Sequence, residues 1–253
     1  MKRVSPTRWI FALSLLAAGS VGALLAADPP APPKLSSIVP AADLVAQAKL
    51  YLASFDKGLA GEQEYKESAS KIERDAHTLT ALALALANHD ADNELQAAAP
   101  AVMAASQALA AAQDYAAAHA ALKSLHAAME GKGEKGGAPK WGCVAPMDQL
   151  MKQVVFVNNR LKRGMRRFAK QTEEQARDAA VLAVIAQEFV YDDPGIAESD
   201  DLDRWYQLCG QMRDAAGELN AKARAADKAG AEAALAKLAQ SCDDCHEVFR
   251  VEE

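Results

Sequence analysis

Residues 235–249 read Leu-Ala-Lys-Leu-Ala-Gln-Ser-Cys-Asp-Asp-Cys-His-Glu-Val-Phe. The apolar and thiol side chains of this stretch recur every three or four residues, at Leu235, Leu238, Cys242, Cys245 and Phe249. That period places them on one face of an α-helix.

Three further stripes of the same period precede this helix, and each predicts another helix with one apolar face. They are Met147, Leu150, Val154, Val157, Leu161, Met165 and Phe168; then Leu182, Ile185 and Phe189; and then Leu202, Trp205, Cys209, Met212, Ala216, Leu219 and Ala223. A break at residues 192–195 separates the second stripe from the third. Four helices joined by short connections predict an antiparallel four-helix bundle.

The first half of the chain repeats this plan with weaker stripes. Its helices are expected to begin near Ala41, Gln63, Asn93 and Asp114. A segment rich in Gly, Lys and Pro, residues 131–142, separates the halves and predicts a linker. The sequence therefore predicts an all-α protein of two tandem antiparallel four-helix bundles, residues 38–130 and residues 143–253. The abundance of alanine and the low aromatic content of 6% agree with helices rather than sheets.

Short matches in the same order suggest that the two bundles arose by duplication. Pro40, Leu44 and Gln47 match Pro146, Leu150 and Gln153; Arg74-Asp75-Ala76 matches Arg177-Asp178-Ala179; and Ala120-Ala121-Leu122 matches Ala233-Ala234-Leu235. Chance similarity among alanine-rich helices is the alternative. Continuing the last match places residues 129–133 opposite residues 242–246, so the first bundle lacks both thiols and the histidine of the second.

The N-terminal residues predict an export signal rather than part of the fold. Lys2, Arg3 and Arg8 lead into an apolar run over residues 9–27, which four prolines follow within residues 28–37. We expect a signal peptide of residues 1–27, cleaved near Ala26 or Ala27, and then a Pro-rich linker; an uncleaved membrane anchor is the alternative. The expected location is periplasmic. The net charge of −6 argues against a nucleic-acid partner.

The segment Cys242-Asp243-Asp244-Cys245-His246 has the Cys-x-x-Cys-His pattern of c-type haem attachment. Thiols three residues apart on a helix can both add to the vinyl groups of one porphyrin. His246 follows Cys242 by four residues, so its ring can reach the iron as the proximal ligand. A redox dithiol and a structural zinc site are the alternatives, but the first fits a βαβ setting better and the second needs a fourth ligand. We predict one covalently bound haem c.

The end of the chain, residues 242–250, resembles the ending of class II c-type cytochromes, the cytochrome c′ family, and the resemblance extends over residues 146–250. It implies that Trp205 occupies the family's aromatic position in the third helix. It also implies that Arg250, four residues past His246, lies near the proximal histidine, although a solvated terminal arginine is the alternative. In the family the first helix of the bundle covers the distal face of the haem.

The sixth iron ligand decides the function that the resemblance implies. Met151 is the candidate distal ligand and would give a six-coordinate electron carrier, although methionine at helical spacing is often core filler. Val154 or Val157 at that position would leave a five-coordinate iron that binds NO or CO. The prediction is an exported mono-haem electron-transfer protein, with the gas-binding module as the alternative. The expected partners are a redox partner protein, a small gas in the alternative, and a second copy of the chain.

The remaining candidate residues carry weaker signals. Cys143 and Cys209 form a disulfide, or Cys209 is a buried thiol. The histidines of the first half, at positions 77, 89, 119 and 126, lack ligand spacing and are expected to be surface or partly buried side chains. The sequence has no nucleophile triad, phosphate loop or paired-carboxylate pattern, so an enzyme is not predicted.

Overall fold

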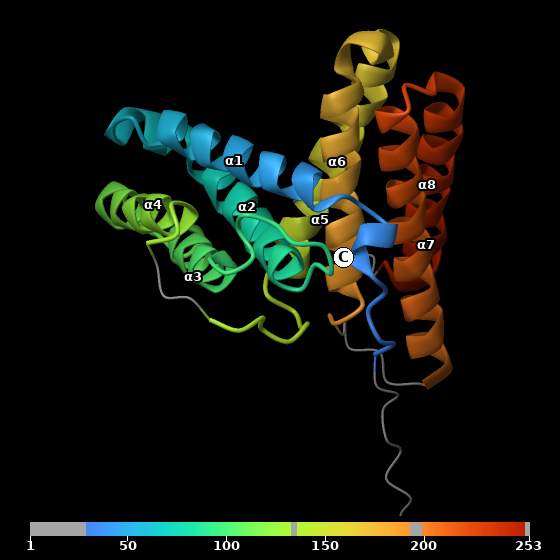
Figure 1. Cartoon of the computed structure of the whole chain (residues 1–253), viewed down its shortest axis with the longest axis horizontal. Helices are drawn as coiled ribbons and strands as arrows, with labels where there is room; N and C mark the ends of the chain where they lie inside the picture. Colours follow the sequence, from blue (N-terminus) through green and yellow to red (C-terminus); the bar gives the residue numbers. More distant parts are fainter. Residues whose placement is uncertain (1–28, 133–135, 193–198, 251–253) are drawn as a thin grey trace, which may run out of the picture.

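The computed structural model describes residues 29–132, 136–192 and 199–250, and over these residues the fold is all-α (Figure 1). Its helices are α1 (Ala41–Gly58), α2 (Glu62–Ala87), α3 (Ala99–Ala110), α4 (Tyr115–Met129), α5 (Met147–Gly164), α6 (Phe168–Phe189), α7 (Ser199–Arg224) and α8 (Lys228–Phe249). Short 3-10 turns, Leu35–Ser37 and Met165–Arg167, precede α1 and α6. The predicted all-α fold class is confirmed.

Local side-chain chemistry explains where several helices begin. The carboxylate of Asp114 accepts a hydrogen bond from the amide of Ala117, and Asp227 does the same for Gly230, so each caps its helix. The predicted starts near Ala41, Gln63 and Asp114 agree with α1, α2 and α4.

The predicted start near Asn93 is wrong, since α3 begins six residues later, at Ala99. The Asn93 side chain accepts a hydrogen bond from the amide of Leu95 and donates one to the carbonyl of Leu86. These bonds hold the following residues in turns, as asparagine side chains often do. The helix then starts with Pro100 in its first turn, where the missing N–H costs nothing.

The four stripes of the second half correspond to α5–α8, with one difference at the first boundary. Phe168 was expected on the first helix but begins α6. The apolar period continues through the intervening turn because Met165 and Phe168 both remain buried against the core. Gly164 ends α5 where α6 approaches closely, since a Cβ there would overlap the side chain of Gln175. The predicted break at residues 192–195 falls mostly outside the described residues, between Phe189 and Ser199.

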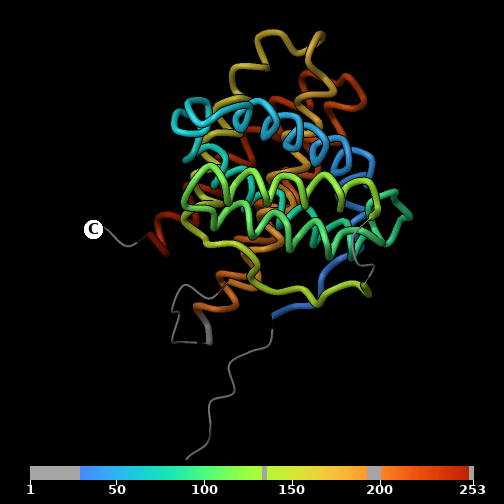
Figure 2. The backbone as a smooth tube through the Cα atoms, turned by 90° about the vertical axis from the view of Figure 1, so that its left-hand side faces the viewer, coloured from blue at the N-terminus to red at the C-terminus, as the bar shows by residue number. Residues whose placement is uncertain are grey.

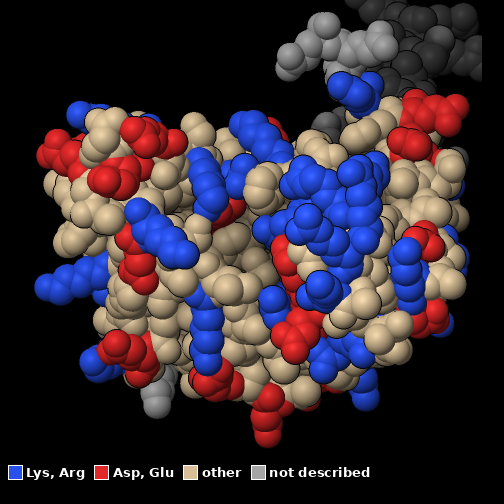
Figure 3. Space-filling view, turned by 90° about the horizontal axis from the view of Figure 1, so that it is seen from above, with Lys and Arg blue, Asp and Glu red and all other residues tan. Residues whose placement is uncertain are grey.

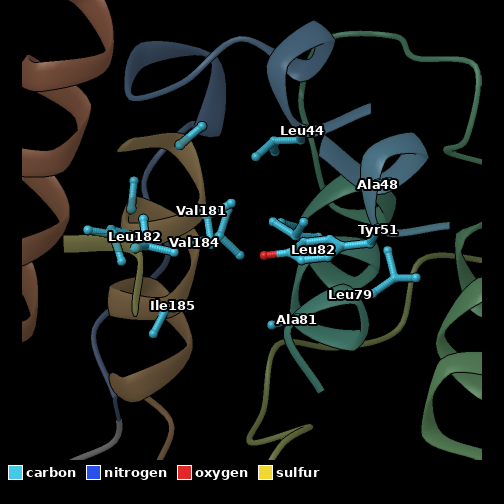
Figure 4. Packing of buried hydrophobic residues seen from close by; sticks show 14 of the residues in the cluster. Leu44, Ala48, Tyr51, Leu79, Ala81, Leu82, Val181, Leu182, Val184 and Ile185 are labelled. Atoms are coloured by element: carbon cyan, nitrogen blue, oxygen red, sulfur yellow. The ribbon is translucent and has the colours of Figure 1, made fainter. Parts of the chain in front are cut away.

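The two halves share one continuous core. Within each half, consecutive helices pack side by side, and Figure 2 shows α3 and α4 running together across one side of the molecule. Between the halves, α1 packs on α6 and α2 packs on α5 and α6. Figure 4 shows Leu44, Tyr51 and Leu82 of the first half facing Val181 and Val184 of α6.

Buried polar contacts also join the halves. Asn220 of α7 donates to the Asp43 carboxylate of α1 at 2.7 Å, and Gln153 of α5 donates to the hydroxyl of Tyr51 at 2.7 Å. The predicted duplication makes α1 equivalent to α5 and α2 equivalent to α6. If α1 is exchanged with α5 and α2 with α6, the contact between α1 and α6 becomes the contact between α5 and α2. Both contacts are present, as an approximate two-fold relation between the halves requires.

Within the second half, α5 and α8 do not pack closely, although each packs on its sequence neighbour. A pocket occupies the space between them. In the described ranges no helix combines the length and the apolar character needed to cross a bilayer.

Candidate functional site

The pocket between α5, α7 and α8 has a volume of about 430 Å³, which lies within the usual range for ligand and cofactor sites. Its wall is mainly apolar, with contributions from Val154, Phe189 and Leu208. Six of the residues that the sequence predicts for the site line this one pocket: Met151, Trp205, Cys242, Cys245, His246 and Arg250.

The last two turns of α8 present the attachment motif to the pocket. The side chains of Cys242 and Cys245 are half-buried, while His246 is exposed at the rim. Arg250 is exposed and adopts an extended backbone, and its amide donates to the carbonyl of His246 at 3.3 Å to end the helix. The helix therefore brings both thiols and the imidazole to one opening.

Trp205 of α7 packs against the end of α8 that carries the motif. It is almost fully buried, and its indole N–H donates to the backbone carbonyl of Phe189 at 2.9 Å. Its ring meets the edge of Phe249 with the centroids 5.3 Å apart in a T-shaped arrangement. Because Phe249 follows His246 by three residues, this contact holds the segment that carries the imidazole.

The pocket favours the neutral form of both motif thiols. Burial and the Asp243 carboxylate raise the pKa of Cys242, and the Lys162 ammonium partly offsets that rise. Burial and the neighbouring Cys242 raise the pKa of Cys245 to about 11. Catalytic dithiols have lowered pKa values, so this environment speaks against the redox-dithiol alternative. Among the described residues, no three His, Cys, Asp or Glu side chains are arranged to hold a metal ion, as the zinc alternative would require.

Helix α5 forms the wall opposite the motif. Met151, Val154, Val155 and Asn158 line the pocket from this helix. Val157, which the sequence offered as an alternative distal residue, is fully buried in the core and is not among the lining residues. Between the two valines of that alternative, Val154 is therefore the one at the pocket.

Sequence reasoning missed Asn158. Its side-chain oxygen is buried without a hydrogen-bond partner, which is unusual in a folded interior. The signal was present in the sequence, because Asn158 follows Met151 and Val154 at helical spacing and interrupts an apolar row. Leu208 and Met212 of α7 also line the pocket. Their direction depends on how α7 is rotated against α5, which the local sequence does not specify.

The two remaining cysteines are free in the structure. Cys209 is buried and lines the pocket, and burial raises its pKa, so the buried-thiol alternative describes it. Cys143 is exposed at the start of the second half. None of the first-half histidines lines the pocket. The expectation of surface or partly buried side chains is wrong for His89, which is fully buried because the backbone groups of Val39 and Ala91 pair with its two ring nitrogens. His126 contacts Asp56 at 2.6 Å.

The residues of this pocket fit a haem c. Two thiols and an imidazole stand at one opening, a thioether lies on the opposite helix, and the wall between them is apolar. Thiols suit thioether formation, imidazole and thioether suit iron, and an apolar wall suits a porphyrin face. The amide oxygen of Asn158 can also accept a hydrogen bond that no group of the described chain donates.

Comparison with known proteins gives one match. Residues 200–250 match the family model described as cytochrome C′. The matched span contains α7 and α8, and with them Trp205, both motif thiols and His246. The match supports a haem-binding c-type cytochrome. Neither the curated proteins nor the solved structures contain a significant match to the chain.

Proposed function

We propose that the protein, whose residues 200–250 match the cytochrome c′ family, is an exported c-type cytochrome that carries one covalent haem and transfers electrons. The observation that supports this proposal is the pocket between α5 and α8, because Met151, Trp205 and the three residues Cys242, Cys245 and His246 all line it. The cytochrome c′ family is usually exported, which supports a periplasmic location. The predicted signal peptide lies outside the described residues.

Five residues of the pocket have a defined role in this proposal. Cys242 and Cys245 hold the cofactor through thioether bonds, and His246 is the proximal ligand. A bound haem c supplies a one-electron Fe(III)/Fe(II) couple, whose potential depends on ligands, burial and nearby charge. Trp205 fixes the end of α8, while the apolar wall excludes water. Met151 is the candidate sixth ligand because its thioether lies on the opposite helix within the same pocket.

A gas-binding module is the second candidate function. It is supported by Val154, an aliphatic side chain that shares the α5 wall with Met151. If the Met151 thioether does not bind the iron, Val154 leaves the distal position open.

An optical spectrum of the protein exported by a host that attaches c-type haem tests the proposal. The expected result is a covalent haem band with a low-spin spectrum that carbon monoxide does not change. Replacing both motif thiols, in Cys242→Ala/Cys245→Ala, should abolish covalent haem. If the wild-type protein carries no haem band, the proposal is wrong. A high-spin spectrum that carbon monoxide shifts would instead make gas binding the function.

The Met151→Leu variant tests the sixth ligand. It should convert the low-spin spectrum to a high-spin, carbon monoxide-sensitive one and should lower the potential, because a thioether ligand raises it. Met147→Leu is the matched control, since Met147 lies one turn earlier on α5, packs on the core and does not line the pocket. Equal spectra for Met151→Leu and wild type would show that Met151 is not an iron ligand.

A further inference from the structure

A dense group of cations covers the corner where α5 turns into α6. This basic corner consists of Lys162, Arg163, Arg166, Arg167 and Lys170, all of which are exposed. Figure 3 looks down on it and shows the Lys and Arg side chains gathered into one surface. Residues 149–172 contain no Asp or Glu, although the whole chain has a net charge of −6. The corner is therefore positively charged, although the chain as a whole is acidic.

The cations of the basic corner have no partners within the described chain. None of the five makes an ion pair, whereas the nearest cations on the same helices do. Arg160 binds the buried carboxylate of Asp178, and Arg177 contacts Glu173 at 3.6 Å. The corner is thus left with unneutralised charge next to residues that are neutralised.

Helix electrostatics account for only part of this arrangement. Lys162 and Arg163 lie in the last turn of α5, where the helix dipole favours cations. Arg167 and Lys170 lie at the N-terminal end of α6. The first turn of this helix contains no acidic residue. There the dipole disfavours positive charge, and the cations also repel one another. Folding stability therefore does not explain the cluster.

The basic corner begins beside the candidate haem pocket. Asn158 lines the pocket, and Lys162 follows it by one helical turn, roughly 6 Å along α5. The ammonium of Lys162 is close enough to lower the pKa of Cys242 against the larger effects of burial and Asp243. A molecule bound at the corner would therefore lie next to the edge of the pocket.

The character of the surface favours a protein over a lipid membrane. Membrane-binding surfaces combine cations with exposed aromatic or aliphatic side chains that enter the bilayer. The two large apolar residues of the corner, Met165 and Phe168, are only 7% and 3% exposed. A surface of charge without exposed apolar anchors is typical of transient electrostatic docking, which speeds encounter between proteins.

We propose that the basic corner docks an acidic protein surface beside the pocket between α5 and α8. Resting on the proposed function, the docked partner exchanges one electron with the haem: the iron is oxidised from Fe(II) to Fe(III) as the partner gains the electron. The docking itself does not depend on the cofactor.

Binding is tested on the full-length protein with a short poly-L-glutamate as the acidic probe. The wild type should bind it at low salt and release it as salt shortens the Debye length to about 8 Å. Arg163→Glu/Arg166→Glu/Arg167→Glu should weaken binding roughly tenfold or more, because three favourable charges become unfavourable. The matched control is Lys57→Glu/Lys66→Glu/Lys123→Glu, which changes the net charge equally at exposed cations that have no ion pair in the described structure.

The control variant should bind nearly as well as wild type. Equal weakening in both triple variants would show that only net charge matters and would overturn the proposal. Vesicles of phosphatidylglycerol serve as a second probe. Tight binding to these vesicles with no binding to poly-L-glutamate would also overturn it, in favour of a lipid surface. Thermal unfolding by circular dichroism establishes that each variant is folded.

The electron-transfer step is tested by oxidising the reduced haem protein with hexacyanoferrate(III), an anion that gains one electron from the iron. Its rate should fall with salt and should drop roughly tenfold in the corner variant, but not in the control. A cationic cobalt(III) complex should show the opposite change. A protein without a reducible haem would refute the proposed function but would not affect the binding result. If the corner variant loses binding but reacts at the wild-type rates, the basic corner has no role in electron transfer.

Discussion

At the scale of single residues, Glu188 is an ionisable group in an unusual setting. Its side chain is fully buried at the end of α6, and one carboxylate oxygen accepts hydrogen bonds from the amides of Val144 and Ala145. Its other oxygen has no partner. Burial raises the pKa of Glu188 to about 7, Asp192 adds to that rise, and the two amides and Cys143 oppose it. The segment that enters α5 is therefore anchored by a carboxyl group that titrates near neutrality.

The Glu188→Gln variant should stabilise the protein only at higher pH. The folded pKa lies above the ordinary value of 4.5, so the stability from the protonated form is complete below about pH 4.5 and is lost as the pH rises through about 7. The gain of the variant should grow over this range to an order of 2–3 kcal/mol. Thermal unfolding from pH 4 to pH 8, with the exposed Glu173→Gln as control, measures it. A pH-independent difference would show that Glu188 titrates normally.

The residue scale also marks the limit of what the sequence could predict about the site. The thiols and His246 follow from one contiguous motif, and Trp205 and Arg250 follow from a family resemblance. Met151 required only the assumption that the first helix of an up-down bundle lies beside the last. Asn158 and Met212 depend on the rotation of α5 and α7 about their axes, which long-range packing determines. The structure places all of these residues in one pocket, and their chemical roles stay predictions.

At the scale of helices, the packing of α7 depends on the segment that precedes α1. A Cβ at Gly217 would lie 2.8 Å from a side-chain carbon of Ile38 and 3.0 Å from its backbone oxygen. Ile38, which directly follows the 3-10 turn Leu35–Ser37, therefore packs onto α7 at a glycine. Helix propensity alone would favour alanine at this position by about 1 kcal/mol.

Two glycine substitutions on α7 should therefore have opposite effects. Gly217→Ala should destabilise the protein by roughly 1–3 kcal/mol, because the backbone of Ile38 must shift. Gly210→Ala should stabilise it by up to about 1 kcal/mol, because the nearest atom to its new Cβ is the flexible Arg213 side chain at 3.7 Å. Chemical denaturation of the two variants measures the contrast. Stabilisation by both would mean that residues 35–38 do not pack on α7 in solution.

Helix boundaries show where sequence periodicity fails. The stripe that includes Leu161, Met165 and Phe168 has an unbroken helical period, yet the chain turns a corner within it. A turn whose side chains still face the core leaves no mark in the apolar pattern. At Asn93, by contrast, side-chain bonds to the backbone delay the helix, and the asparagine itself was the available signal.

At the scale of the whole molecule, the sequence matches predicted two repeats but not how they meet. The junction uses α1 and α2 of one half against α5 and α6 of the other, with buried contacts such as Gln153 to Tyr51. Nothing in a stripe of apolar residues distinguishes a face that packs within a bundle from one that packs between bundles. The shared core implies that the halves stabilise each other, and this makes their cooperativity testable.

The Leu125→Ala variant should destabilise the second half as well as the first. Leu125 is fully buried in α4, which packs on α1, α2 and α3, so its direct contacts belong to the first half. The cavity should cost roughly 2–5 kcal/mol. Because α1 and α2 pack on α5 and α6, the haem band and far-ultraviolet circular dichroism should lose their native signals at one lowered midpoint. If the midpoint of the haem band stays at its wild-type value while half of the helical signal is lost earlier, the halves unfold independently, and the core they share contributes little to holding the pocket together.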